Sequence, residues 1–514
     1  MSESGAHDAS MDSTPAWQRD TSTFVPLEQA AIDALNIEYT GIATDSRKVK
    51  PGDLFIAYAG ELADGRAYIP QALVAGAVAV LWDASEFTWS PAWKVPNQSV
   101  ANLRYQVGYI ADNFFGHPSR HLWIAGITGT NGKTSCAQWI AQSLTGLGRQ
   151  CAVIGTLGSG LVGESAATQA PVNTTPDAVS LQATLAGMKV QGAHAVAMEV
   201  SSHGIEQGRV NGVAFDVALF TNLTRDHLDY HGSINAYKKT KERLFSWPFL
   251  KHAVINLDDR FGAELASRID RSRVNVIGYG FGKGEIAGHN LDLSTRGLKL
   301  EIKTPWGAAQ VSSSILGAFN AHNMLGVLGV LACADVRLDD AVAAVSELEP
   351  VPGRMQTIRE DGYPLIAIDY AHTPDALEKA LETLRDLLIP GAKLHCVFGC
   401  GGDRDAGKRP LMGEIATRLA HQSVITSDNP RSENPRTIID EIAEGAHASY
   451  RIEPDRAVAI HDAIQDATPD DIVLIAGKGH ETHQEIAGQR VPFSDFEVVR
   501  ALTENRESSG GARV

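Results

Sequence analysis

The sequence has few cysteines, no excess of basic residues and no long apolar run. Its five cysteines stand at positions 136, 151, 333, 396 and 400, a spacing that fits neither a metal-binding motif nor a disulfide framework and is compatible with a reducing compartment. Acidic residues number 61 against 45 basic ones, and the formal net charge of −16 argues against a nucleic-acid partner, whose electrostatic footprint is basic. Apolar runs such as residues 324–334 are far too short to span a membrane.

The N-terminus, residues 1–20, is polar and acidic and lacks the apolar segment of a signal peptide. We therefore expect a cytoplasmic protein. We also expect it to be a monomer and to act on small molecules. We predict disordered tails over residues 1–24 and 506–514.

With 514 residues, 44% of them apolar and 21% charged, the chain is long enough for about three domains of ordinary size. Apolar runs that end in polar residues alternate with helical segments from residue 119, and the pattern restarts near residue 351. We predict an α/β protein with a small N-terminal α/β domain (25–118), a central domain with a mostly parallel sheet (119–350) and a second α/β domain (351–505).

A glycine-rich segment, residues 126–135, follows an apolar run and precedes a helical pattern. This order is typical of a P-loop, in which backbone N–H groups and the N-terminus of a helix face a phosphate. Lys133 would reach the terminal phosphates, and the hydroxyl of Thr134 would bind Mg²⁺. Position 127 is isoleucine where the strict pattern has glycine. The alternative is a glycine-rich turn before an ordinary helix.

Polar residues follow the strands predicted after the P-loop. Glu199 ends one apolar run, and His227 lies a few residues beyond the next. Ligands gather at the carboxyl ends of the strands in a parallel sheet, so we expect both residues near the phosphate loop. Glu199 is a natural oxygen ligand for Mg²⁺, although a carboxylate at a strand end can also be a structural hydrogen-bond acceptor.

Lys241 is a lysine on an apolar helical stripe. Ile234, Tyr237, Leu244 and Phe245 share its face at spacings of three and four residues. Its ammonium group could reach back to water, the commoner fate of such lysines. If it stays near bound metal, desolvation lowers its pKa and makes the neutral amine reactive. Such an amine can take up CO₂ as a carbamate, which is a carboxylate-like metal ligand.

Charged residues also follow the strands of the last domain. Arg404, Arg431 and Glu481 each come after an apolar run. Two guanidinium groups suit a carboxylate and an acidic residue suits an ammonium group, so together they are complementary to an amino acid with two charged ends. The alternative is a set of surface salt bridges.

Four segments resemble the Mur ligase family, in the same order along residues 40 to 500. They are Gly129 to Thr134, Glu199 to His203, Thr221 to Asp229 and Asp369 to Pro374. The resemblance implies an N-terminal domain for uridine diphosphate, a central P-loop ATPase and a mobile Rossmann-like C-terminal domain for the incoming amino acid. The family's loop is Gly-Thr-Asn-Gly-Lys-Thr, which accounts for Ile127.

Within the family, the likeness is to members that add the third residue of the peptidoglycan stem peptide. The run from Asp428 to Arg431 resembles those that add meso-diaminopimelate to UDP-N-acetylmuramoyl-L-alanyl-D-glutamate. Arg431 could clamp the carboxylate at the far end of diaminopimelate, which lysine lacks. The alternatives are a lysine-adding ligase and a ligase like folylpolyglutamate synthase.

The resemblance also implies residue roles. Lys133, Glu199, His227 and Lys241 would be catalytic, and two Mg²⁺ ions would be held by Thr134, Glu199, His227 and a Lys241 carbamate formed with CO₂. ATP would meet Gly129, Thr130, Asn131, Gly132, Lys133, Thr134, Ser135, Asn323, Arg354 and Asp369. The UDP-muramoyl-dipeptide would meet Thr44, Ser46, Asn173, Thr174, Thr175, Ser201, Gln207 and Arg209. Diaminopimelate would meet Arg404, Asp428, Asn429, Pro430, Arg431, Gly477 and Glu481.

The mechanism implied is acyl activation. A substrate carboxylate would attack the γ-phosphate of ATP, and the amine of the amino acid would then displace phosphate from the acyl phosphate. His203 could hold either the helix that carries Lys241 or the substrate.

Overall fold

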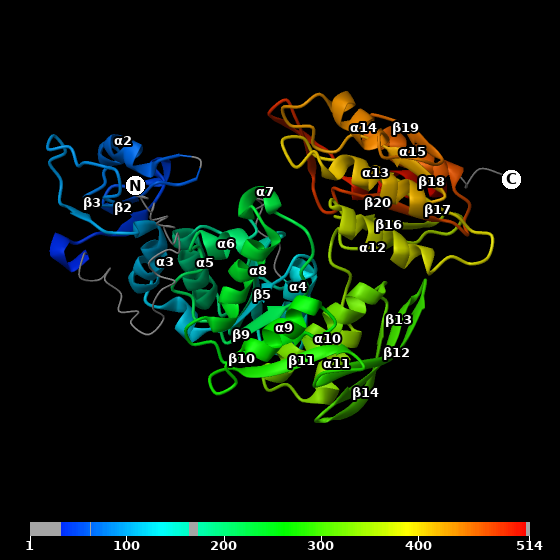
Figure 1. Cartoon of the computed structure of the whole chain (residues 1–514), viewed down its shortest axis with the longest axis horizontal. Helices are drawn as coiled ribbons and strands as arrows, with labels where there is room; N and C mark the ends of the chain where they lie inside the picture. The colour runs from blue at the N-terminus through cyan, green and yellow to red at the C-terminus, as the bar shows by residue number, and fades with distance from the viewer. Residues whose placement is uncertain (1–31, 62, 164–172, 510–514) are drawn as a thin grey trace, which may run out of the picture. The chain divides into compact units, whose positions relative to one another are not determined.

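The computed structural model of this chain describes residues 32–61, 63–163 and 173–509 (Figure 1). The predicted tail over residues 1–24 lies outside the described residues. The predicted tail over 506–514 is described only as far as Ser509, the last residue of helix α16 (Asp495–Ser509). The chain divides into two compact units, residues 1–114 and 115–514.

The first unit is a small parallel sheet with helices. Its four strands follow the order β1-β2-β3-β4 and pair in parallel throughout. Phe55, Ile69 and Val80 lie in its core, each 0% exposed. The strands are β1 (Gly41–Ala43), β2 (Asp53–Ala57), β3 (Ala79–Trp82) and β4 (Asn97–Ser99), and the α-helices are α2 (Ile69–Val74) and α3 (Leu103–Phe114).

The second unit begins with a ten-stranded sheet in the order β14-β13-β12-β11-β10-β9-β5-β8-β6-β7. The seven neighbouring strands β12, β11, β10, β9, β5, β8 and β6 pair in parallel. Strand β7 at one edge, and β13 and β14 at the other, are antiparallel. The strands are β5 (Trp123–Thr128), β6 (Cys151–Gly155), β7 (Gly158–Leu161), β8 (Ala195–Glu199), β9 (Val217–Phe220), β10 (His252–Asn256), β11 (Asn275–Phe281), β12 (Ile286–Ser294), β13 (Gly297–Thr304) and β14 (Gly307–Ser313).

Helices cover both faces of this sheet (Figure 1). Alternate residues of β5, β8 and β9 point to opposite faces, as the period of a strand requires. Ile127 packs with the helices of one face and Ile124 with those of the other. The first face carries α4 (Lys133–Gly146), α10 (Ala318–Cys333) and α11 (Leu338–Ser346), and the second carries α5 (Ala178–Val190), α6 (Ser202–Glu206) and α9 (Arg260–Arg268).

A second, six-stranded sheet follows in the order β15-β16-β20-β17-β18-β19, parallel except for the edge strand β15. Helices α12, α13 and α14 pack on one face, and α15 and α16 pack on the other. The strands are β15 (Gln356–Ile358), β16 (Leu365–Asp369), β17 (Leu394–Phe398), β18 (Gln422–Ile425), β19 (Tyr450–Ile452), β20 (Ile472–Ala476) and the hairpin β21 (His483–Ile486) and β22 (Gln489–Pro492). The helices are α12 (Pro374–Arg385), α13 (Lys408–Leu419), α14 (Pro435–Ala443) and α15 (Arg456–Asp466).

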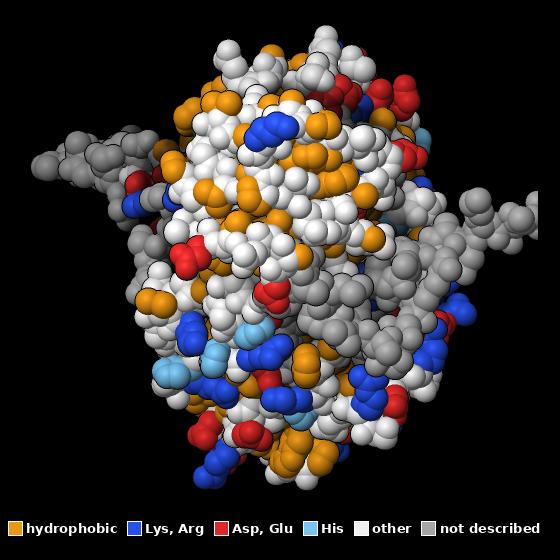
Figure 2. All heavy atoms as spheres, turned by 90° about the vertical axis from the view of Figure 1, so that its left-hand side faces the viewer, with side chains coloured by type: hydrophobic (Ala, Val, Ile, Leu, Met, Phe, Trp, Pro, Cys, Tyr) orange, Lys and Arg blue, Asp and Glu red, His pale blue; other side chains and the backbone are white. Residues whose placement is uncertain are grey.

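The predicted α/β class with a mostly parallel central sheet is confirmed. Within the described residues, no helix is both long and apolar enough to cross a membrane. On the face that Figure 2 presents, basic and histidine side chains stand among acidic ones, so the net negative charge does not form a continuous acidic surface there.

Candidate functional site

The P-loop connects β5 to α4. Its turn requires Gly129 and Gly132, whose φ angles are +150° and +85°, because side chains disfavour that backbone region. Any Cβ on Gly129 would also collide with the Thr221 hydroxyl. Ile127 is not part of the turn: it is a β5 residue, 0% exposed in the core. The departure from the strict motif therefore lies in the strand.

The segment after β9 holds this loop in shape. The N–H groups of Thr130 and Asn131 donate to the backbone and side-chain oxygens of Asn222, at 2.8 and 2.9 Å. The hydroxyl of Thr221 donates to the Asn131 carbonyl at 2.6 Å. The Thr224 N–H donates to the Thr130 hydroxyl at 3.0 Å. Sequence reasoning assigned these β9 neighbours no role, although they belong to a motif that carries the resemblance.

Glu199 and Thr134 form an oxygen-rich corner beside the loop. The Thr134 hydroxyl donates to Glu199 Oε2 at 3.0 Å, and the Thr156 N–H donates to Oε1 at 2.7 Å. Glu199 is 1% exposed, and Gly155 leaves the space that its carboxylate fills. A buried carboxylate next to a hydroxyl is a donor set that fits Mg²⁺. Arg354 Nη2 donates to the same Thr134 hydroxyl at 3.2 Å.

Lys241 is buried at the other side of the loop. It is 1% exposed, and its Nζ donates to the Gly129 carbonyl at 2.8 Å and lies 4.5 Å from the Tyr237 ring centroid. Burial, with a smaller contribution from the charge of Lys133, lowers the pKa of Lys241 well below its usual value. The lysine therefore does not reach back to water. Ile234, predicted on the same stripe, is 36% exposed and Tyr237 is 1% exposed, so the buried part of the stripe begins at Tyr237 in α8 (Ile234–Glu242).

His227 caps the short helix α7 (Leu228–His231) in a left-handed conformation, with φ of 52°. Burial lowers its pKa to about 4 against the opposing charge of Asp226, 3.3 Å away. A neutral imidazole is the form that ligates metal. Its ring lies 4.8 Å from that of His203, centroid to centroid. Among the described residues, no group of three or more His, Cys, Asp or Glu side chains forms a ready metal site, so Glu199 and His227 would need other ligands.

Five of the residues predicted for the muramoyl peptide meet next to Glu199. The Thr175 hydroxyl donates to the Glu199 carbonyl at 2.9 Å and lies 3.0 Å from Ser201 Oγ. The Thr174 hydroxyl lies 3.2 Å from that of Thr156. Arg209 donates to the Thr175 carbonyl at 2.9 Å and to Gln207 Oε1. Asn173 is exposed.

Thr44 and Ser46 belong to the first unit. They follow β1, and the Ser46 hydroxyl donates to Gln71 Oε1 at 3.2 Å.

Three predicted ATP residues lie beyond the loop. Asn323 is 6% exposed on α10, and a side chain on Gly132 would press against its amide oxygen. Arg354 lies 4.6 Å from the Tyr370 ring centroid. Asp369 accepts from the Met355 N–H at 2.6 Å, and burial raises its pKa against the opposing charge of Arg354.

Sequence reasoning missed Asp375. Its Oδ2 accepts hydrogen bonds from Asn131 Nδ2 at 3.0 Å and from the Thr224 hydroxyl at 3.2 Å, which ties α12 to the P-loop. The residue stands in the first turn of α12, where an acidic side chain is expected for helix stability alone. The local pattern therefore gave no sign of the long-range contact.

The predicted amino-acid pocket lies at the carboxyl ends of β18 and β20. Glu481 Oε2 accepts from Asn429 Nδ2 at 2.8 Å, and Asp428 Oδ2 faces Gly477, where a Cβ would come within 3.1 Å. Arg431 Nη1 donates to the Gly402 carbonyl at 2.6 Å. Asp428, Asn429, Gly477 and Glu481 are thus brought together, and Pro430 and Arg431 continue the same loop.

Three polar atoms in this pocket make no hydrogen bond with the described residues. Asp428 Oδ1 is buried, 3.7 Å from Lys478 Nζ. Glu481 Oε1 and Arg431 Nη2 belong to part-exposed side chains, and Arg431 Nε lies 3.4 Å from Glu485 Oε2. A carboxylate ligand would satisfy the guanidinium, and an ammonium ligand would satisfy the acids. Arg404 is exposed and has no hydrogen bond or ion pair with any described residue.

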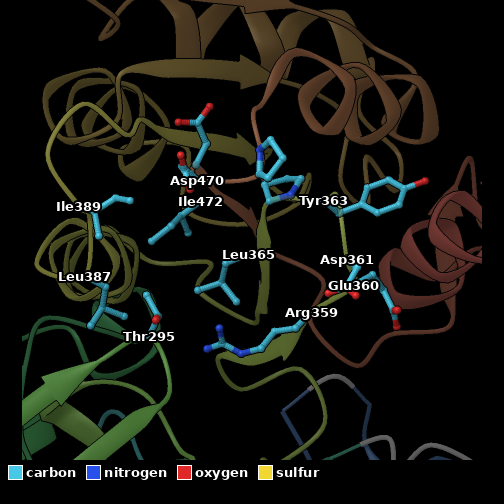
Figure 3. Close-up of a pocket in the computed structure, with 13 residues that line it drawn as sticks. Thr295, Arg359, Glu360, Asp361, Tyr363, Leu365, Leu387, Ile389, Asp470 and Ile472 are labelled. Carbon is cyan, nitrogen blue, oxygen red and sulfur yellow. The ribbon is translucent and has the colours of Figure 1, made fainter.

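A separate pocket of about 290 Å³ opens at the other end of this sheet (Figure 3). Leu365 and Ile472, the first residues of β16 and β20, lie in its lining with Arg359 and Asp470. It contains none of the predicted site residues, because these follow the carboxyl ends of the same strands.

Comparison with known proteins gives the same family over nearly the whole chain. Residues 38–115 match the Mur ligase family catalytic domain, residues 127–331 the Mur ligase middle domain and residues 353–479 the Mur ligase glutamate ligase domain. The chain belongs to the Mur ligase family. It is therefore an ATP-dependent ligase that joins an acid to an amine.

Relatives within the family carry a more particular name. A Chromobacterium violaceum protein named UDP-N-acetylmuramoyl-L-alanyl-D-glutamate--2,6-diaminopimelate ligase is 51% identical, covering 93% of this chain and 97% of its own. A Nitrosomonas europaea protein of the same name is 48% identical, covering 92% and 94%. A solved structure of that name is 36% identical, with a TM-score of 0.67, and covers 91% of this chain and 95% of its own.

Proposed function

We propose that this ligase adds meso-diaminopimelate to UDP-N-acetylmuramoyl-L-alanyl-D-glutamate, a step of peptidoglycan synthesis. The observation that carries the proposal is the pocket containing Arg431, Asp428 and Glu481, in which Asp428 Oδ1 is buried without a hydrogen-bond partner and Arg431 Nη2 and Glu481 Oε1 make no hydrogen bond with the described residues. The far end of diaminopimelate supplies a carboxylate and an ammonium group. Lysine has no distal carboxylate for Arg431, and a site built to hydrogen-bond a substrate group disfavours an analogue that lacks this group. The relatives that share the chain's length carry this activity in their names.

In the first half-reaction the side-chain carboxylate of the D-glutamate residue attacks the γ-phosphorus of ATP. The bond from this phosphorus to the bridging oxygen breaks, giving an acyl phosphate and ADP. The N–H groups of the P-loop hold the phosphates, and Lys133 turns toward them from its present partners, the Gly129 and Thr130 carbonyls. Thr134 and Glu199 would hold Mg²⁺, which when bound neutralises charge on the transferring phosphoryl group.

We infer further that Lys241 carries a carbamate and that His227 and this carbamate hold a second Mg²⁺. Carbamylation forms a bond between the lysine nitrogen and the carbon of CO₂ and releases a proton, so it needs the neutral amine. The depressed pKa of Lys241 supplies that form. The change replaces a buried neutral amine by an anion, which suits a site that holds metal cations.

In the second half-reaction the amine of diaminopimelate attacks the acyl carbon, loses a proton and displaces phosphate. Asp428 and Glu481 would keep the distal ammonium in place, which leaves the other amino group free to react. We assign the muramoyl peptide to Thr174, Thr175, Ser201, Gln207 and Arg209 on the evidence of their contacts around Glu199. Asn173 and, for the uridine end, Thr44 and Ser46 stay predictions, as do the domain boundaries, the monomeric state and the cytoplasmic location.

The test is ligation with diaminopimelate, lysine and glutamate offered in parallel to enzyme, ATP, Mg²⁺ and the UDP-muramoyl-dipeptide. We expect product with diaminopimelate and at least about a hundredfold lower kcat/KM with the other two. Preference for lysine or glutamate would overturn the choice of substrate. Phosphate release that is indifferent to every amino acid would overturn ligation itself.

A further inference from the structure

Lys478 is a buried lysine in contact with residues of the proposed diaminopimelate pocket. It follows Gly477 in the turn after β20, and Gly477 and Gly479 have φ angles of +117° and +54°. The turn directs the lysine inward, where it is 0% exposed. A buried lysine is rare unless its ammonium group is paired, so its partners matter.

The partners of the ammonium group are residues already assigned to the pocket. Lys478 Nζ donates to Glu481 Oε2 at 2.7 Å and to Asn429 Oδ1 at 3.0 Å, and lies 3.7 Å from Asp428 Oδ1. No atom of Lys478 faces solvent, so it cannot itself meet a ligand in this arrangement. Any effect on the substrate must pass through these three side chains.

The ammonium group fixes the orientation of the Asn429 amide. Asn429 Oδ1 accepts from Lys478 Nζ and from the Glu485 N–H, at 3.0 Å each. Because lysine can only donate, the amide must turn its oxygen toward it and its Nδ2 toward Glu481 Oε2, at 2.8 Å. Both hydrogen bonds of the Glu481 carboxylate therefore fall on Oε2. Oε1 makes no hydrogen bond with the described residues and is left for a ligand.

The ammonium group also sets the charge of the pocket. Asp428 and Glu481 bring two negative charges, and Asp428 is 6% exposed. Lys478 cancels one of these two negative charges, so the two acids and the lysine together keep a single negative charge, which matches one ammonium group of a ligand.

We propose that Lys478 is a positioning residue for diaminopimelate, which holds Asn429 and Glu481 so that one carboxylate oxygen meets the distal ammonium of the substrate. The inference rests on the proposed function and explains why the pocket would bind only one ammonium group of the substrate. Lys478→Met removes the charge while keeping an unbranched side chain, and Lys478→Gln keeps a hydrogen-bond donor without the charge.

The experiment compares steady-state constants of the full-length enzyme for each substrate. We expect Lys478→Met to raise KM for diaminopimelate by about tenfold or more, because the acids lose their buried partner. KM for ATP and for the UDP-muramoyl-dipeptide should change by less than about twofold. His395→Gln, which alters a buried side chain at the opposite end of the same sheet, is the matched control and should leave all three KM values in place.

A double-mutant cycle with Glu481→Gln separates positioning from a general loss of structure. If Lys478 acts through Glu481, the Lys478 substitution should cost much less in the Glu481→Gln background, since residues in one hydrogen-bond network are not additive. Additive effects, or equal rises in all three KM values, would overturn the positioning role. If Lys478→Met does not fold, Lys478→Gln provides the same comparison.

The wild-type enzyme distinguishes a failure of the proposed function from a failure of the role proposed for Lys478. A wild-type enzyme that does not ligate diaminopimelate overturns the proposed function and this inference together. A wild-type enzyme that ligates it, with an unchanged KM in Lys478→Met, overturns the inference alone.

Discussion

Lys133 and Lys241 donate hydrogen bonds to the same backbone oxygen, the carbonyl of Gly129, at 3.0 and 2.8 Å. Two ammonium groups on one acceptor repel each other, and burial lowers the pKa of both. The repulsion is relieved when Lys133 turns to a phosphate or when Lys241 loses its charge. Carbamylation of Lys241 would remove its positive charge from this carbonyl.

The first prediction concerns Lys241. Lys241→Ala should lower kcat by about a hundredfold or more, because the proposed second metal loses its carbamate ligand. Short carboxylates such as acetate or formate, added at increasing concentration, should restore part of the rate by taking the vacated place. Lys239→Ala, an exposed lysine of the same helix, is the control and should keep its rate. Unchanged turnover in Lys241→Ala would rule out the carbamate.

The second prediction concerns Glu199. Glu199→Gln keeps one oxygen, which can accept from the Thr156 N–H while the new amide N–H faces the Thr134 hydroxyl, but it removes the charge that holds Mg²⁺. We expect the Mg²⁺ concentration for half-maximal ATP turnover to rise by about tenfold or more. The measurement is a magnesium titration at fixed ATP. The same change at Glu264, which lies in exposed ion pairs, should not move the midpoint.

Much of the fold and the chemistry could be predicted because they depend on local patterns. Apolar runs that end in polar residues marked the parallel strands, and Gly-Lys-Thr marked the phosphate loop. The position of Lys241 on an apolar stripe left two outcomes open. In the structure the amine is buried between the Tyr237 ring and the Gly129 carbonyl. Tyr237 lies one turn earlier in the same helix, whereas Gly129 belongs to the distant P-loop.

The rest depended on contacts between distant parts of the chain. Asp375 resembles an ordinary first-turn acid until α12 meets the P-loop. Lys478 stands in a glycine-rich turn whose inward direction follows from backbone angles that the sequence does not state. Arg404 follows a strand as Arg431 does, yet only Arg431 is linked to the hairpin, through the carbonyl of Glu485 at 2.9 Å.

The third prediction concerns Arg431. Arg431→Ala should raise KM for diaminopimelate by about ten- to a hundredfold, because a charge-assisted hydrogen bond to the distal carboxylate is lost. KM for ATP should stay within about twofold, and the preference for diaminopimelate over lysine should shrink by the same factor as the affinity. Arg436→Ala provides the control, since this arginine makes an i,i+4 pair with Asp440 and is 59% exposed. An equal loss for ATP and diaminopimelate would contradict a specific role.

The fourth prediction concerns Ile127, where the strict P-loop motif has glycine. Ile127→Gly restores that motif but empties a core position that is 0% exposed between β8 and β9. The cavity and the added backbone freedom should cost about 3–5 kcal/mol, seen as a lower melting temperature, with no gain in ATP affinity. Ile127→Val removes one methylene and should cost about 1 kcal/mol. Tighter ATP binding by the glycine variant at unchanged melting temperature would show that position 127 belongs to the loop and not to the strand.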